Sequence, residues 1–179
     1  MVGTSVTAPL VSVLAAVLVV AGMGKLRAPA AAADALRAAG LPSGRRYARL
    51  VGALEVLVGV TALALPSALS LGAMAALYAV LAGFAVRLLR TAAPVAGCGC
   101  FGADAPPSPL HAVFDVAAAA IAALAVAGPP PGLPQLAVRA PLAGVGLVAG
   151  CAAAAYAVSL VLTYLPEAAL AYRPGRRPA

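Results

Sequence analysis

Charged side chains are scarce in this chain of 179 residues, since Asp, Glu, Lys and Arg together make up 9% of it. A soluble globular domain has about a quarter of its residues charged and uses them to cover its core. Here 64% of the residues are hydrophobic, and the mean hydropathy is +1.03. The composition therefore excludes a water-soluble fold and predicts a membrane protein surrounded by lipid.

Aromatic residues are also few, at 4% of the chain, and tryptophan is absent. This scarcity disfavours the aromatic platforms on which bases or sugars stack. The net charge of +7 and the pI near 10.0 come from few acids and from basic loops, not from a basic face that carries aromatic residues. We therefore exclude nucleic acid as a partner.

Several catalytic motifs are missing as well. The chain has no P-loop, no GxGxxG after a strand, no HExxH and no C-x-x-C-H motif, so nothing indicates an ATPase or a dehydrogenase. No helix repeats a line of polar residues, which disfavours a conducting channel.

Because Met1–Ala8 holds no Lys or Arg, we interpret the first apolar run as a retained span; a signal peptide cleaved near Ala28 is the alternative.

Charged residues divide the rest of the chain, because a charge at the centre of a bilayer costs about 2.5 to 3.5 kcal/mol. We predict an all-α fold, a polytopic transmembrane bundle of about five helices in which four form the core and the last is added at its periphery. The predicted spans are 8–24, 50–65, 69–86, 110–127 and 142–165.

The connections between these spans have different characters. The first, 25–49, is polar, and we expect a short interfacial helix over 29–39 because a proline begins it and Gly40 follows it. Spans two and three form a tight hairpin. The stretch 128–141 is a Pro-rich loop that cannot be helical throughout, and 166–179 is a basic tail.

The last span contains Gly146 and Gly150 in a GxxxG pattern, with Ala154 further along the same face. Such a pattern lets a second helix approach closely. The alternative is that it only reflects the abundance of Gly and Ala in this chain.

Lysines and arginines are distributed unevenly, and cytoplasmic loops collect them. Five spans leave Arg139 alone on one side and predict an outside N-terminus, a cytoplasmic C-terminus and a cytoplasmic segment 91–109. The cations that share the predicted cytoplasmic side are Lys25, Arg27, Arg37, Arg45, Arg46, Arg49, Arg87, Arg90, Arg173, Arg176 and Arg177.

Two of the three cysteines, Cys98 and Cys100, lie in a glycine-rich turn between spans three and four. A C-x-C pair can close a small, strained disulfide, and strained disulfides are the labile ones that suit thiol exchange. Two alternatives stay open. The thiolates could bind a metal, although only Asp104 and His111 lie nearby as further ligands, or the cysteines could be small structural residues. Cys151 falls within span five and is interpreted as a buried small residue.

Ionisable residues inside a membrane span are candidates for function. Glu55 lies in span two, and we expect Lys25 or Arg49 as its partner; a structural ion pair and a proton or ligand role both stay open. Asp115 follows His111 by about one helical turn on the same face. Either could act as a base toward Cys98 or Cys100, because only a thiolate is nucleophilic. A capping or interhelical hydrogen bond is the alternative for Asp115.

Taken in order, these features resemble the MauE family of methylamine-utilisation membrane proteins, a group related to DoxX-like redox-associated membrane proteins. The resemblance covers about 8–127, so we assign 1–127 as a MauE/DoxX-like membrane domain. It is carried by AGMGKL at 21–26, Pro29, LRAAGLP at 36–42, Glu55 and, above all, CGCFG at 98–102.

The resemblance implies a helical inner-membrane protein of bacteria that supports maturation of an exported, disulfide-rich enzyme, methylamine dehydrogenase being the named case. It implies a thioredoxin-like redox partner and an exported client protein. Cys98 and Cys100 would be the redox pair, and Glu55, Lys25 and Asp115 the accompanying polar positions.

Two departures from the family pattern matter. Similar chains tend to carry an arginine just before the acidic or amide residue early in span four, and this position is Phe114 here. The predicted topology also places CGCFG on the cytoplasmic side, which is awkward for a periplasmic oxidant.

We predict no resident cofactor or metal. Two other functions stay open, a quinone-linked oxidoreductase subunit and a membrane assembly subunit or small-molecule or metal carrier that uses an intramembrane acidic site.

Overall fold

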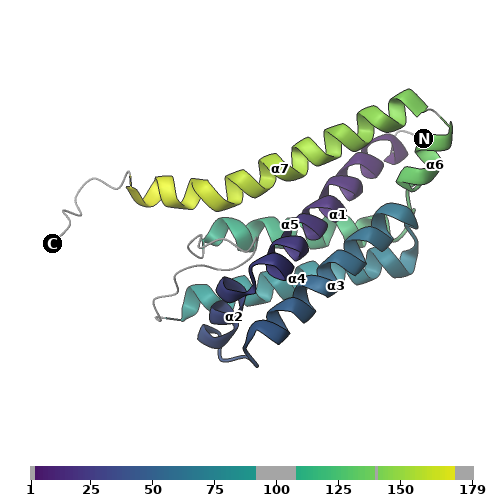
Figure 1. Cartoon of the computed structure of the whole chain (residues 1–179). Coiled ribbons are helices and arrows are strands. Elements are labelled where there is room, and N and C mark those ends of the chain that lie inside the picture. Colours follow the sequence, from purple (N-terminus) through teal and green to yellow (C-terminus); the bar gives the residue numbers. More distant parts are fainter. Residues whose placement is uncertain (1–2, 92–107, 140, 172–179) are drawn as a thin grey trace.

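A computed structural model describes residues 3–91, 108–139 and 141–171 of the chain. Within these ranges the chain is helical and contains no strand, which confirms the predicted all-α bundle. The seven helices are α1 (Gly3–Arg27), α2 (Pro29–Ala38), α3 (Arg45–Ala64), α4 (Ala68–Arg90), α5 (Pro109–Ala125), α6 (Leu133–Arg139) and α7 (Pro141–Ala171) (Figure 1).

Four helices are long and apolar enough to cross a membrane: Thr7–Arg27, Arg45–Ala64, Ala68–Arg90 and Gly144–Leu165. They correspond to four of the five predicted spans. The remaining one is α5, an apolar helix of 17 residues. This length is at the lower limit for a helix that spans about 30 Å of hydrocarbon.

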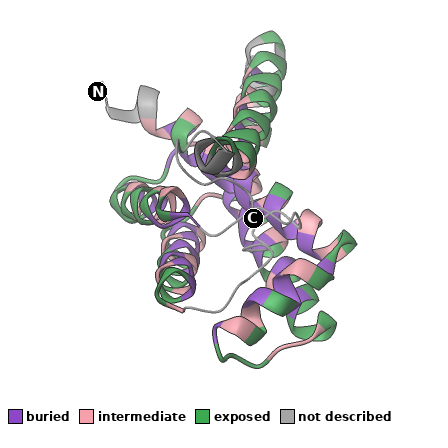
Figure 2. Ribbon diagram, turned by 90° about the vertical axis from the view of Figure 1, so that its left-hand side faces the viewer, coloured by how far each residue is buried: buried purple, intermediate pink, exposed green. Residues whose placement is uncertain are grey.

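The bundle is built from helix pairs that pack along their length. α1 packs mainly on α3, and α4 on α5, while α7 lies alongside α1 (Figure 1). Buried residues line the faces that the helices turn toward one another, and exposed residues cover the outer faces (Figure 2). The fully buried side chains at the centre include Leu18, Leu71, Met74 and Tyr78. Many of the exposed residues are large and hydrophobic. Such an apolar exterior is expected where lipid, not water, is the solvent.

The turn between α3 and α4 shows why the two spans form a tight hairpin. Ser67 is the N-cap of α4, and its hydroxyl accepts a hydrogen bond from the backbone N–H of Ser70 at 3.2 Å. The Ser70 hydroxyl in turn accepts one from the backbone N–H of Ser67 at 2.9 Å. This reciprocal capping satisfies two donors that a helix start otherwise leaves unpaired.

The short helix α2 closes one end of the bundle. Pro29 is at its first position, and the chain leaves it through Gly40, whose φ of +66° is in the left-handed region that favours glycine. Ala35 and Ala39 pack on Leu88 near the end of α4. The helix expected over 29–39 therefore forms and lies against the bundle.

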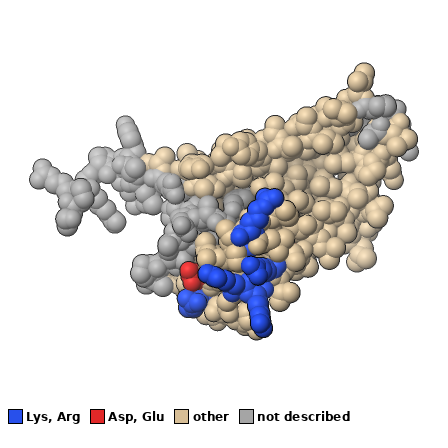
Figure 3. Space-filling model, viewed as in Figure 1, with Lys and Arg blue, Asp and Glu red and all other residues tan. Residues whose placement is uncertain are grey.

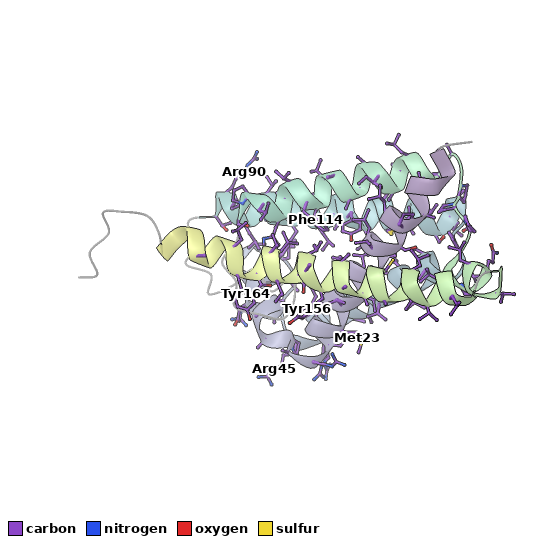
Figure 4. The ribbon with its side chains drawn as sticks, turned by 90° about the horizontal axis from the view of Figure 1, so that it is seen from above. Met23, Arg45, Arg90, Phe114, Tyr156 and Tyr164 are labelled. Carbon is purple, nitrogen blue, oxygen red and sulfur yellow. The ribbon has the colours of Figure 1, made fainter. Side chains whose placement is uncertain are left out.

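The cations of α1 to α4 gather at this same end of the molecule. Figure 3 shows the visible Lys and Arg side chains clustered over one end of the bundle, with the remaining described surface in this view almost uncharged. Figure 4 places Arg45 and Arg90, from the start of α3 and the end of α4, at the outer edge of that end. The positions agree with the predicted grouping of cations; which side of the membrane they face stays a prediction.

Three details differ from the expected organisation. The stretch 128–141 contains a short helix, α6, and α7 continues to Ala171, past the predicted end of span five. Among the described residues, a Cβ atom added at Gly146 or Gly150 would meet no atom within 4 Å apart from its own stretch of helix. The GxxxG pattern therefore brings no described helix of this chain close, and the close helix approaches occur at other glycines.

Candidate functional site

The centre of the candidate site is a buried ion pair between α1 and α3. Lys25 Nζ lies 2.9 Å from Glu55 Oε1 and 2.8 Å from Oε2, so the ammonium donates to both carboxylate oxygens. Glu55 is fully buried, and Lys25 is 6% exposed. Of the two cations expected as partners of Glu55, Lys25 forms the pair.

Glycines bring the two backbones close enough for this pair to form. A Cβ atom at Gly22 would lie 2.5 Å from the carbonyl oxygen of Gly52, and one at Gly52 would lie 2.8 Å from the carbonyl oxygen of Gly22. These glycines precede Lys25 and Glu55 by three residues each, which is about one helical turn. The contact of the two helices at Gly22 and Gly52 therefore sets the distance across which the charged groups meet.

A cavity of about 220 Å³ lies beside the ion pair. Most of its wall is apolar, and its polar groups are Lys25, Glu55, Tyr78, His111 and Asp115. The other lining residues are Val17, Leu18, Ala21, Ala32, Leu36, Leu41, Val51, Val80, Leu81, Phe84, Phe114 and Leu162. Helices α1 to α5 and α7 thus all contribute to one chamber at the cationic end of the bundle.

His111 is held at the start of α5 by the residue that precedes the helix. Ser108 Oγ lies 3.0 Å from His111 Nδ1, and both residues are buried. His111 Nε2 is buried and has no hydrogen-bond partner among the described residues. Asp115, the next residue of this helix face, also lines the cavity. The spacing of His111 and Asp115 predicted that they share a helix face, and in the structure this face lines the chamber.

Tyr78 is a residue of the site that sequence reasoning missed. Its hydroxyl donates a hydrogen bond of 2.7 Å to the carbonyl oxygen of Leu14, which ties α4 to α1. Its ring meets Phe114 edge to face, with centroids 6.1 Å apart and an angle of 75°. Figure 4 shows Phe114 inside the bundle. A tyrosine in the middle of an apolar span was the available signal, because a hydroxyl inside a bilayer needs a partner.

Replacing Tyr78 by phenylalanine removes only the hydroxyl group. We expect the free energy of unfolding in detergent to fall by about 1 kcal/mol, since one interhelical hydrogen bond is lost. Tyr156→Phe is the matched control, because that side chain lies on α7 and its residue is 63% exposed. Equal effects of the two substitutions would contradict a bond that holds α4 to α1.

Cys98, Cys100 and Asp104 lie outside the described residues. Cys151 is a buried free thiol within α7. In the described part of the chain, no three His, Cys, Asp or Glu side chains come together in a group that could hold a metal ion.

Comparison with known proteins places helices α1 to α5 in a family region. The family model described as methylamine utilisation protein MauE matches residues 4–128. The matched region runs from α1 through α5 and contains all residues of the ion pair and of the His111 face. Neither the curated proteins nor the solved structures give a match to the chain.

Proposed function

This chain belongs to the MauE family, and from that premise we propose that it is a membrane thiol-disulfide and electron-transfer accessory protein. It supports maturation of an exported enzyme that contains disulfides. Methylamine dehydrogenase, the case for which the family is named, is one candidate client. Its place in this proposal is the bacterial inner membrane, with the C-x-C pair on the side where the exported client lies.

The observation that carries the proposal is the position of the C-x-C pair between two helices of the family region. Cys98 and Cys100 follow the end of α4 and precede the start of α5. α5 then brings His111 and Asp115 into a chamber that also holds Glu55. The two thiols therefore come directly before the helix that carries the proton-accepting groups His111 and Asp115.

The proposed reaction moves two electrons and two protons between thiols. A client thiolate attacks the disulfide between Cys98 and Cys100, which forms a mixed disulfide and releases one of the two cysteines as a thiol. The second client thiolate then attacks the client sulfur of the mixed disulfide and releases the other cysteine. The client gains a disulfide, and Cys98 and Cys100 become thiols. A thioredoxin-like partner in its disulfide form then accepts the same two electrons and two protons, which restores the pair.

Different polar groups have different parts in this proposal. His111 or Asp115 accepts the proton of an attacking thiol, because the thiolate is the reactive form. The Lys25–Glu55 pair supports the site by fixing α1 against α3. Substitution of Glu55 or Asp115 would then slow the thiol exchange more than it would lower the amount of protein in the membrane.

The test replaces Cys98 and Cys100 together by serine. We expect membrane insertion to be unchanged and maturation of the client to be lost, since no intramolecular disulfide can form. Thiol trapping in intact cells, with a membrane-impermeant and a permeant maleimide, reports both the redox state of the pair and the side it faces. Cys151→Ser is the matched control, because that thiol is buried in α7. Full client maturation in the double variant would contradict the proposal.

A second candidate function is favoured by the chamber itself. A non-catalytic assembly subunit, or a carrier of a small molecule or metal ion, would use the buried carboxylate of Glu55 and the chamber beside it. For this function, conservative changes of Glu55 or Asp115 would be more damaging than removal of the cysteines. The two sets of variants, compared in one maturation assay, separate the candidates.

A further inference from the structure

Most arginines at the cationic end of the bundle have no acidic partner among the described residues. Lys25 pairs with the buried Glu55, and on α2 Asp34 takes up Arg37. The arginines of α1, α3 and α4 that remain are exposed and are Arg27, Arg45, Arg46, Arg49, Arg87 and Arg90. Figure 3 shows the visible cations of this end side by side, with almost no acidic surface between them. The anion that balances this charge therefore comes from outside the described chain.

The start of α3 carries the densest group of these cations. Arg49 follows Arg45 by four residues and Arg46 by three, so the three side chains are neighbours on the helix surface. The first turn of α3 contains no acidic residue that would offset them. A guanidinium group is planar and donates two parallel hydrogen bonds to a phosphate. Phosphate oxygens are thus the acceptors that suit this group best.

The length of α3 places the three arginines at the boundary of the hydrocarbon layer. The span Arg45–Ala64 has 20 residues, which at 1.5 Å per residue is about 30 Å, the thickness of that layer. Tyr47 lies in the same turn and is 50% exposed. Tyrosine is enriched where the acyl chains meet the headgroups. The phosphates of membrane lipids lie at this level, within reach of the guanidinium groups.

An apolar stripe continues from the arginines along the outward face of α3. Leu50, Leu54 and Leu57 follow Arg46 in steps of four, four and three residues, which keeps them on one face of the helix. Their exposed fractions are 66%, 49% and 61%, so the described helices leave this face open. A phospholipid matches both parts, with a phosphate at the arginines and acyl chains along the leucines. A soluble anion or an acidic peptide matches the arginines alone.

We propose that this outward face of α3 is a binding site for an anionic phospholipid. The site consists of Arg45, Arg46, Arg49, Leu50, Leu54 and Leu57. The lipid phosphate accepts hydrogen bonds from the guanidinium groups. A zwitterionic lipid brings a cation beside its phosphate, so the site prefers a headgroup with a net negative charge. Groups of four to eight basic residues at a membrane boundary attract such lipids, and Arg27, Arg87 and Arg90 extend the positive field around the site.

The test titrates the purified full-length chain in detergent with dioleoyl phosphatidylglycerol, which is anionic, or with dioleoyl phosphatidylcholine, which is zwitterionic. Native mass spectrometry measures the lipid-bound fraction at each concentration. We expect the wild type to bind the anionic lipid more tightly. Arg46→Gln should weaken that binding about fivefold, the equivalent of about 1 kcal/mol, and leave the zwitterionic lipid unaffected. The triple variant Arg45→Gln, Arg46→Gln, Arg49→Gln should lose the preference.

Two controls separate the headgroup from the acyl chains. Arg37→Gln removes one positive charge from the same end of the bundle, but Arg37 is already paired with Asp34. It should bind both lipids nearly like the wild type. The double variant Leu50→Ala, Leu57→Ala shortens the apolar stripe at two exposed positions. It should weaken binding of the two lipids by the same factor and keep the preference for the anionic one.

Several outcomes would overturn the proposal. Equal affinity of the wild type for the two lipids, or an undiminished preference in the Arg46→Gln and triple variants, would show that these arginines bind no anionic headgroup. Displacement of the anionic lipid by inorganic phosphate would make this a site for a soluble anion, and displacement by polyglutamate would make it a surface for an acidic protein segment. The proposal goes beyond the thiol function, and replacing Cys98 and Cys100 by serine should leave lipid binding unchanged.

Discussion

Replacing Lys25 by methionine is expected to lower the free energy of unfolding by about 3 to 5 kcal/mol. The substitution keeps a long, flexible side chain but leaves the Glu55 carboxyl group without its ammonium partner. Glu55 is fully buried, so water cannot replace the two hydrogen bonds that Lys25 donates at 2.9 and 2.8 Å. Denaturant titration of the purified protein, followed by the loss of helical circular dichroism, measures the change.

The double variant Lys25→Met with Glu55→Leu tests the reason for this loss. When both charged partners of a buried pair are replaced by apolar groups, stability is often restored or even raised by about 1 to 4 kcal/mol. We therefore expect the double variant to be more stable than Lys25→Met alone. If the second substitution instead adds a further loss, the unpaired buried charge is not the cause.

A surface ion pair supplies the control for this experiment. Arg37 and Asp34 form a pair of 3.0 Å on α2, with both side chains more than half exposed. Asp34→Ala should change the stability only slightly, because exposed pairs contribute little in water. A well-folded Lys25→Met, Glu55→Leu variant that also matures its client normally would show that the pair serves the fold alone; a folded variant that fails would assign the pair to the chemistry.

Most of the helices, and their order along the chain, could be predicted from the sequence, because charges and prolines mark the ends of apolar segments. The short helix over 29–39 and the hairpin at Ser67 have local signals, a proline at one helix start and two serines at another. Packing between helices has no such signal. The GxxxG pattern in α7 contacts no other described helix, whereas the isolated Gly22 and Gly52 bring two backbones together.

The candidate site was predictable only in part, for the same physical reason. Glu55 and Lys25 stand out because charges are costly inside a membrane, and their pairing follows from the need to neutralise them. His111 and Asp115 share a helix face, which the spacing indicates. That this face and the ion pair line the same chamber depends on how α5 is placed against α1 and α4. This placement is set by the shapes of apolar side chains such as Leu71 and Met74. Tyr78 was missed because one hydroxyl changes an apolar pattern very little.

The close approach of α1 and α3 leads to the second large effect, which we expect at Gly22. Gly22→Ala should lower the free energy of unfolding by about 1 to 3 kcal/mol, because overpacking forces the backbone to shift. The new Cβ atom would lie 2.5 Å from the carbonyl oxygen of Gly52, and a backbone oxygen in a helix has little freedom to move away. The helices must separate, and the Lys25–Glu55 hydrogen bonds one turn away must then lengthen.

The same chemical change elsewhere should have the opposite sign. Gly83 is in the interior of α4, and a Cβ atom added there would meet nothing within 4 Å. Gly83→Ala should therefore stabilise the protein by up to about 1 kcal/mol, the difference in helix propensity between the two residues. Denaturant titration of both variants gives the comparison. If Gly22→Ala is as stable as Gly83→Ala, the backbones of α1 and α3 do not meet at this glycine, and the ion pair does not owe its short distances to that contact.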